Sequence, residues 1–277
     1  MKFGFVLPYG DAQAAGELAA ELEQAGWDGL FVWEPVWGYD AWILLAAAAV
    51  RTERLRLGTM ITPLARMRPW KLASETVTLD HLSNGRVILS VGLGAVDTGW
   101  AAFGEPTDRK TRAELLDEGL AILTGLWAGQ PFSFEGQHYH IEPLDFLPPP
   151  PPVQKPRIPI WVVGAWRHSK SMRRALAYDG LLPNVIGVDG SARTPTVAEV
   201  AEIAADIRAQ RGSQAPYDLV VEGSTPGDDP TAAADQVRPW VQAGATWWIE
   251  ALWDAVDDPG GPARALQRAR QGPPRVD

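Results

Sequence analysis

Two kinds of hydrophobic pattern alternate along the chain. Short runs rich in β-branched and aromatic residues, such as RVILSVGLG at 86–94, are nearly continuously apolar, as in strands buried on both faces of a parallel sheet. Between them, apolar residues recur at helical spacing, as Ala15, Leu18 and Leu22 do before the helix-ending Gly26. The runs predict strands at 2–8, 29–34, 55–62, 86–94, 157–165, 180–184, 217–223 and 245–253.

A helical pattern follows each predicted strand. The predicted helices lie at about 12–25, 40–51, 69–82, 108–128, 169–178, 196–212, from Pro230 onward, and at 260–270. Eight βα units in a chain of 277 residues predict one α/β domain over 1–277, a (β/α)8 TIM barrel. The alternative is a doubly wound open sheet.

One segment interrupts this alternation after the fourth unit. FSFEGQHYHI has the pattern of a β-hairpin, and the run Pro148 to Pro152 must be extended rather than helical. Residues 130–156 are therefore predicted to form a hairpin and proline-rich insertion.

Composition removes several classes of function. The net charge is −9 and no run of basic residues occurs, so a nucleic-acid partner is not expected. Without cysteine there is no disulfide, thiolate metal site or cysteine nucleophile. The start, MKFGFVLPYG, lacks the long apolar segment of a signal peptide, and the apolar run at 41–50 is about half a membrane span. We expect a cytoplasmic protein without a membrane partner.

In a barrel of this kind the site lies at the carboxyl ends of the strands. Those ends are rich in Gly, Trp and apolar residues, and poor in titratable groups. No GxSxG nucleophile motif occurs, and His138 and His140, an alternative metal pair, fall in the insertion. The pattern favours a site for a flat, apolar, partly anionic molecule, with no resident metal.

The series LRLGTMITPLARMRPWKLASETVTLDHLSNGRVILSVGLG resembles the luciferase-like flavin-dependent oxidoreductases. This family includes bacterial luciferase, alkane and nitrilotriacetate monooxygenases, and F420-dependent reductases. The resemblance extends over residues 2–253, with PIWVVGA as a further matching segment. It implies a bound flavin-type cofactor, either reduced FMN or F420.

The resemblance gives the end of the third strand a specific form. In family members this strand ends in a bulge with a non-prolyl cis peptide bond that backs the cofactor ring. Position by position, the bond falls at Met60–Ile61, with Thr59 beside it and Gly58 relieving crowding. The alternative is an ordinary strand end with trans peptide bonds.

Two further segments are implied to hold the cofactor. The fourth strand passes the reactive edge of the ring in luciferase. The luciferase cysteine position is Gly92 here, its phosphate-binding arginine position is Leu93, and Gly92 and Gly94 are expected to leave room for the ring. In VGAWRHSKS, relatives bind the cofactor phosphate at a helix start. Arg167 is predicted to replace the missing arginine; a solvated basic loop is the alternative. The implied contacts are Gly164, Ala165, Trp166, Arg167, Ser169 and Lys170.

The second strand departs from the family. Luciferase and several F420 enzymes carry an acidic residue followed by His, whereas this chain has Glu34 followed by Pro35. Glu34 is therefore the first acid–base candidate, with a pKa raised by its tryptophan neighbours. Asp40 is a second candidate, or else a helix cap, and Asp97 is a weaker one. Trp33, Trp37, Trp100 and Trp253 are candidate walls of the ring or substrate site, or else core tryptophans.

Three functions remain open at this stage. The favoured one is a reduced-FMN-dependent monooxygenase that acts on a small organic substrate and receives its flavin from a separate flavin reductase. The alternatives are an F420-dependent dehydrogenase or reductase, and a flavin- or small-molecule-binding barrel without turnover. Relatives are commonly dimers, and the apolar helices at 41–50 and 70–83 are the candidate homodimer interface. The sequence does not decide between FMN and F420 as the cofactor. It also does not identify the substrate, the general base, or whether oxygen is used.

Overall fold

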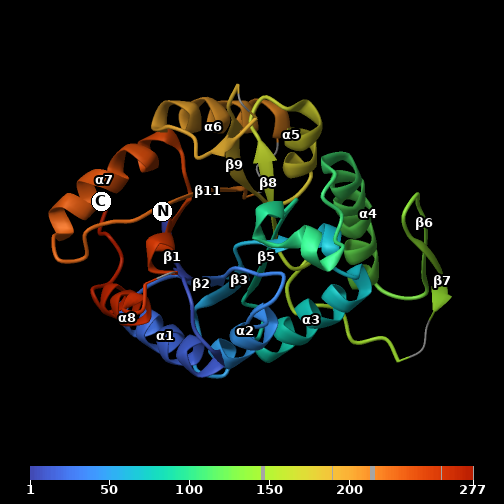
Figure 1. The fold of residues 1–277 in the computed structure, drawn as a ribbon, viewed down its shortest axis with the longest axis horizontal. Coiled ribbons are helices and arrows are strands. Elements are labelled where there is room, and N and C mark those ends of the chain that lie inside the picture. The colour runs from blue at the N-terminus through green and yellow to red at the C-terminus, as the bar shows by residue number, and fades with distance from the viewer. Residues whose placement is uncertain (145–146, 189, 213–215, 257, 277) are drawn as a thin grey trace.

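A closed ring of parallel strands forms the centre of the molecule (Figure 1). The computed structural model describes residues 1–277 except 145–146, 189, 213–215, 257 and 277. Each strand of the ring pairs in parallel with the next, and the last pairs with the first, so the predicted TIM barrel is confirmed. In order, the strands are β1 (Lys2–Leu7), β2 (Gly29–Val32), β3 (Arg56–Thr59), β5 (Val87–Gly92), β8 (Ile160–Ala165), β9 (Gly180–Ile186), β11 (Asp218–Gly223) and β12 (Trp247–Glu250).

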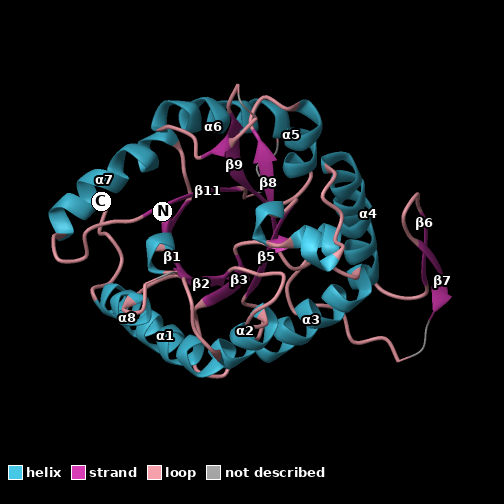
Figure 2. Cartoon of the chain, viewed as in Figure 1, coloured by secondary structure: helices cyan, strands magenta, loops and turns pink. Residues whose placement is uncertain are grey.

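Helices surround the ring on its outer side (Figure 2). Several begin at an aspartate whose carboxylate accepts a backbone N–H of the first turn, as Asp11, Asp108 and Asp229 do. The helices are α1 (Ala12–Ala25), α2 (Ala41–Ala49), α3 (Pro69–Leu82), α4 (Arg109–Ala128), α5 (Ser169–Leu176), α6 (Val197–Arg211), α7 (Pro230–Ala243) and α8 (Gly261–Arg270). In the described part of the chain, none is both long and apolar enough to cross a membrane.

The insertion is a two-stranded hairpin at the side of the barrel, next to α4 (Figure 1). Its strands β6 (Phe132–Glu135) and β7 (His140–Leu144) pair antiparallel, as predicted. The carboxylate of Glu118 accepts three successive backbone N–H groups of the connecting turn, which fixes the hairpin to α4. His138 lies 3.0 Å from Glu114 and His140 contacts Glu135, and no metal-binding group of side chains is found among the described residues.

The predicted strand at 55–62 is in fact two pieces. Strand β3 ends at Thr59, residues 60–61 bulge out, and a short strand β4 (Thr62–Pro63) then pairs with β5. Another two-residue strand, β10 (Ala192–Arg193), pairs antiparallel with the end of β9 and was not predicted. Both short strands lie at the carboxyl ends of barrel strands. Their paired segments are too short to show a hydrophobic period.

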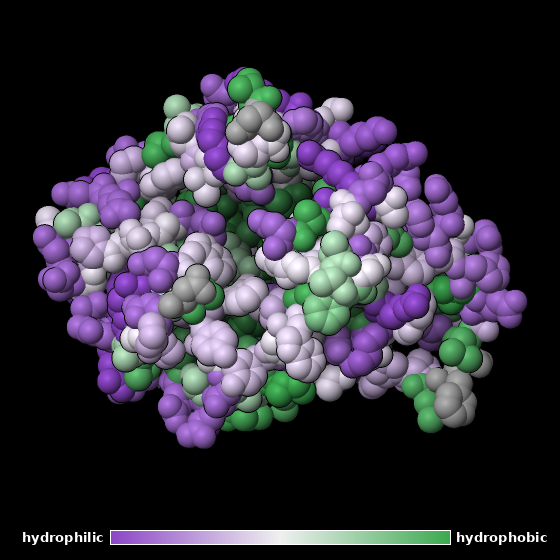
Figure 3. All heavy atoms as spheres, in the orientation of Figure 1, coloured by the Kyte–Doolittle hydropathy of each residue, from purple (hydrophilic) through white to green (hydrophobic). Residues whose placement is uncertain are grey.

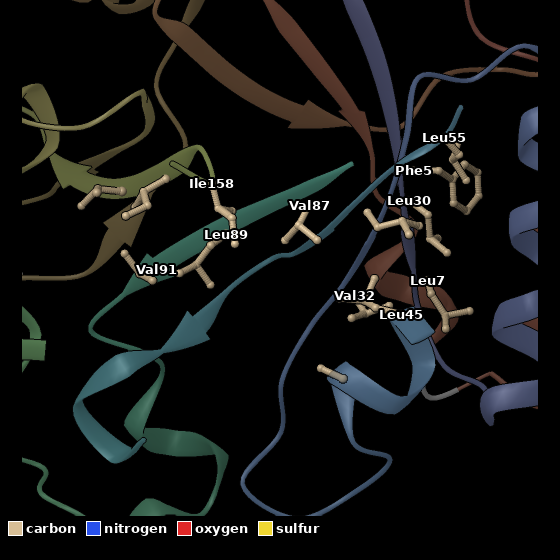
Figure 4. Packing of buried hydrophobic residues seen from close by; sticks show 14 of the residues in the cluster. Phe5, Leu7, Leu30, Val32, Leu45, Leu55, Val87, Leu89, Val91 and Ile158 are labelled. Atoms are coloured by element: carbon tan, nitrogen blue, oxygen red, sulfur yellow. The ribbon is translucent and has the colours of Figure 1, made fainter. Parts of the chain in front are cut away.

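Two apolar cores lie on either side of the barrel wall. The outer core packs strand residues such as Leu30, Val87 and Leu89 against the helices (Figure 4). Inside the barrel, three aromatic rings are in mutual contact. The ring of Phe31 stacks on Trp161 with centroids 5.3 Å apart, and Trp247 meets Trp161 edge-on at 5.2 Å. These rings fill the barrel near the amino ends of the strands, which we call its lower part. The open space therefore lies above them, toward the carboxyl ends of the strands.

Gly58 is the position where this filling depends on the absence of a side chain. A Cβ there would lie 2.6 Å from the carbonyl oxygen of Ile88 and 2.8 Å from the ring of Phe31. We expect Gly58→Ala to destabilise the fold by about 1–3 kcal/mol, because neither neighbour can move freely. Urea unfolding measures the change. Gly260→Ala, where a Cβ makes only ordinary contacts, should change stability by less than about 0.5 kcal/mol. Equal effects of the two substitutions would contradict this packing.

Candidate active site

A cavity of about 250 Å³ opens at the carboxyl ends of the strands, above the three aromatic rings. Figure 3 shows the hollow at the centre of this face, with hydrophobic residues deep inside it. The walls are mainly apolar. The lining residues are Met60, Ile61, Val163, Leu182, Pro183, Asn184, Thr194, Pro195, Val220, Val221, Glu222, Trp240 and Trp253.

The cavity is open on one side because two neighbouring strands separate. Strand β9 pairs with β11 only at Gly180 and Leu181. Beyond this point β9 continues to Ile186 and pairs instead with β10. The gap lets the cavity reach Val221 and Trp240, which belong to the outer core, as well as the inner residues. The site therefore has a closed floor and an open flank.

The bulge after β3 forms part of the floor. The peptide bond Met60–Ile61 is cis, as the family resemblance predicted. The N–H of Met60 donates to the carbonyl of Val32 at 2.7 Å, which continues the pairing with β2. Both Met60 and Ile61 line the cavity and pack against the inner core. The bulge thus presents an apolar surface to whatever occupies the cavity.

A chain of hydrogen bonds holds both flanks of this bulge. The hydroxyl of Thr59 donates to the carbonyl of Ser90 at 3.1 Å, and the hydroxyl of Thr62 donates to Thr59 Oγ1 at 3.1 Å. The Thr62 hydroxyl also faces the carboxyl of Glu34, where it acts to lower the pKa of that group, against the larger effect of burial.

The surroundings of Glu34 favour the protonated form. Its Oε2 atom is buried and without a hydrogen-bond partner in the described structure. Burial raises the pKa of Glu34 from 4.5 to about 7. The predicted rise in pKa is therefore confirmed. The carboxyl nevertheless points toward the bulge, and it is not among the described residues that line the cavity.

The glycines of the fourth strand require a correction. We expected Gly92 and Gly94 to leave room for a ring. Instead, a Cβ on Gly92 would lie 2.6 Å from the side chain of Ile61, and one on Gly94 would lie 2.4 Å from the ring of Trp100. Protein side chains fill both spaces. The two glycines, with Leu93 between them, accommodate the bulge and the loop rather than opening the cavity.

The loop after β8 lies beside the cavity without lining it. Arg167 has a left-handed backbone with φ of 66° and its guanidinium pairs with Glu202 at 3.0 Å. Ser169 and Lys170 are exposed in the first turn of α5, and no side chain caps that turn in the described structure. Gly164 and Ala165 end β8, where a Cβ on Gly164 would clash with Leu181. The basic groups flank the helix start.

The four candidate tryptophans separate into different environments. Trp253 lines the main cavity. Trp33 and Trp37 line a smaller cavity of about 90 Å³ at the ends of β1 and β2, where Trp37 is 85% exposed. Trp100 is buried and stacks under the guanidinium of Arg112, so it belongs to the packed interior, the alternative stated above. Only Trp253 is brought to the main cavity.

The remaining acidic candidates lie outside both cavities. Asp40 accepts the N–H of Ile43 at 2.9 Å and caps α2, the alternative that the sequence suggested. Asp97 is exposed in the loop after β5, in a short 3-10 helix at Val96–Thr98. Neither side chain is among the described lining residues.

Sequence analysis missed the acidic residue that does face the cavity. Glu222 is the one titratable side chain among the described residues that line it. The strand pattern contained the signal, because alternation from the apolar inner residue Val220 places Glu222 on the inner face.

The chain belongs to the luciferase-like monooxygenase family, whose model matches residues 1–273. A putative coenzyme F420-dependent oxidoreductase of Mycobacterium tuberculosis is 37% identical over 147 residues, which is 51% of this chain and 41% of that protein. The match thus spans less than half the length of this curated relative.

Solved structures show the same fold at low identity. The F420-dependent tetrahydromethanopterin reductase of Methanopyrus kandleri has a TM-score of 0.76 at 17% identity, covering 98% of each chain. The oxygenating constituent of 3,6-diketocamphane monooxygenase of Pseudomonas putida, solved with FMN, has a TM-score of 0.74 at 17% identity, covering 100% of this chain and 99% of that one. The barrel is thus shared with both FMN and F420 proteins.

The protonation of Glu34 gives a prediction about stability. The folded protein holds this proton more tightly than the unfolded chain does. The stabilisation is therefore complete below about pH 4.5 and is lost as the pH rises through about 7, a change of up to about 3 kcal/mol. Glu34→Gln cannot ionise and keeps nearly the same side-chain shape in this buried position. We expect it to flatten this pH dependence and to be more stable than the wild type at about pH 8.

Urea unfolding at about pH 5 and about pH 8 makes the comparison. Glu17→Gln on the exposed face of α1 is the control, and it should follow the wild type. Parallel pH profiles of the wild type and Glu34→Gln would show that Glu34 is not protonated in the folded protein.

Proposed function

We propose that the chain is an oxidoreductase that binds the ring of a flavin-type cofactor in the main cavity, and that it acts as a reduced-FMN-dependent monooxygenase on a small organic substrate. The observation that carries the proposal is the apolar cavity above the Met60–Ile61 bulge. Its volume of about 250 Å³ is near the lower end for small-molecule sites, ~300 Å³. It suits one flat ring system, while the rest of a cofactor must extend through the open flank.

The residues present fit such a group. Met60 and Ile61 would support one face of the ring, and Val163 and Leu182 would exclude water from it. The uncapped start of α5 provides free backbone N–H groups for a phosphate. Lys170 would add positive charge there, and Arg167 would do so once released from Glu202. The bound cofactor supplies the redox chemistry, which explains why so few acid–base groups face the cavity.

F420-dependent hydride transfer is the second candidate. The named activity of the mycobacterial relative favours it. The monooxygenase proposal includes a separate flavin reductase as partner, whereas the F420 alternative does not require one. A binding barrel without turnover is the third possibility, and catalysis assays on a loaded protein distinguish it from the other two.

Cofactor titration tests the proposal. We expect purified protein to bind either FMNH2, added anaerobically, or F420 in the micromolar range, with quenching of tryptophan fluorescence. Preferential binding of FMNH2, together with substrate-dependent oxygen uptake, would support the monooxygenase. Preferential binding of F420 would support hydride transfer. Absence of binding by FMN, FMNH2 and F420 would contradict the proposal.

A bulky residue at the cavity rim tests the location. The side chain of Asn184 lines the cavity from the end of β9, and its backbone remains free to accept the N–H of Trp166 at 2.7 Å. We expect Asn184→Trp to weaken cofactor binding about tenfold or more, because the indole occupies the space of the ring. Val188→Trp is the matched control, since Val188 is fully exposed and outside the cavity. Equal affinity of the two variants would place the cofactor elsewhere.

We further propose a homodimer through α2 and α3. Large apolar side chains are exposed there, with Ile43 61%, Trp70 44% and Leu82 50% accessible. Large exposed apolar side chains on two helices that pack together are typical of an interaction surface. Sedimentation of the wild type should give a dimer and Ile43→Glu a monomer. Leu144→Glu, an equally exposed position on the hairpin, should leave the dimer intact. A monomeric wild type would contradict the proposal.

A further inference from the structure

Glu222 is the one charged side chain among the described residues that line the cavity. In the register of β11 with β12, Val220 pairs with Trp247 and Glu222 pairs with Ile249. Val220, Trp247 and Ile249 all belong to the inner core, whereas Leu219 and Val221 pack outside. Glu222 is therefore the next inward-facing residue, directly above the packed interior and at the level of the cavity.

The groups around its carboxyl leave it incompletely paired. The side chain of Trp253, from the segment after β12, lies beside it and acts to lower its pKa. Burial has the larger effect and raises the pKa of Glu222. No other described lining residue carries a charge.

The nearest acidic groups on β11 and β12 are committed to other partners. Asp218 lies four residues earlier on β11 and accepts from Trp161 and Thr246. Glu250, on β12, is fully buried in a pair with Arg268 and Thr225. Neither group is therefore available as a partner for Glu222, which lines the cavity.

We infer that Glu222 is the specificity-determining group of the cavity, and that it selects a substrate with a hydroxyl group on an apolar body. The inference rests on the proposed function, in that the substrate shares the cavity with the cofactor ring. The apolar body would contact residues such as Leu182 and Val220, while the hydroxyl donates to the carboxyl of Glu222 beside Trp253. A hydrocarbon of the same shape would displace water from the carboxyl and leave it unpaired, which is unfavourable.

A pair of probes of similar shape tests this selection. Cyclohexanol and methylcyclohexane differ in the presence of the hydroxyl. We expect the wild type to bind cyclohexanol about tenfold or more tightly than methylcyclohexane, measured by the shift in unfolding temperature on titration. Glu222→Leu should bind methylcyclohexane more tightly than cyclohexanol, because the leucine side chain packs favourably against an apolar ligand. Glu222→Gln should keep the order, because its amide oxygen accepts the same hydrogen bond. Glu17→Leu on α1 controls for the loss of one carboxylate and should match the wild type.

A general loss of stability would not reverse the order of the two affinities in Glu222→Leu while leaving it unchanged in Glu222→Gln. An unchanged order in Glu222→Leu, or no response of the wild type to cyclohexanol up to its solubility limit, would overturn the inference. The titrations are made on the free protein and on protein saturated with whichever cofactor binds. If no cofactor binds, the proposed function fails while the free-protein titration still tests Glu222. If a cofactor binds and the hydroxyl preference is absent, only the role of Glu222 fails.

Discussion

The aromatic packing inside the barrel is the constraint on which the site depends. Phe31, Trp161 and Trp247 fill the lower interior, with ring centroids 5.2–5.9 Å apart. Rings of this size fit only because facing strand positions carry glycine. A Cβ on Gly180, for instance, would lie 2.3 Å from the ring of Trp161. The rings close the barrel from below and set the depth of the cavity.

Above this base, the site combines a fixed floor with an open flank. The floor is fixed because hydrogen bonds from Thr62 through Thr59 to Ser90 hold the bulge on both sides. The flank is open because β9 leaves β11 after two paired positions. A rigid apolar surface beside an opening suits a ligand that inserts one flat end and leaves its polar remainder outside. This is the physical basis for proposing a flavin-type cofactor here.

Much of the fold could be predicted because it follows from periodicity. The strands and helices were found since apolar runs and helical repeats bury their faces against neighbours regardless of detail. The cis peptide bond at Met60–Ile61 was predictable only from the family resemblance, because no local pattern specifies it. The bulge at residues 60–61 likewise came from the resemblance, whereas the short strands β4 and β10 were not predictable, since pairing of two residues leaves no periodic signal.

The site residues were harder to predict, because their roles depend on which way a side chain points. Glu34 has the raised pKa expected of it but faces the bulge. Gly92 and Gly94 make room for Ile61 and Trp100, and a sequence cannot show whether a glycine faces a ligand or another side chain. Glu222 could have been found, because alternation along 217–223 places it on the inner face with Val220.

The most direct test of the account is a crystal structure of the protein with FMN or F420 bound. The account predicts that the ring lies on Met60 and Ile61, with one edge toward Glu222 and Trp253, and that the phosphate lies at the start of α5 near Lys170. A ring bound in the smaller cavity beside Trp33 and Trp37, or a phosphate far from α5, would contradict it.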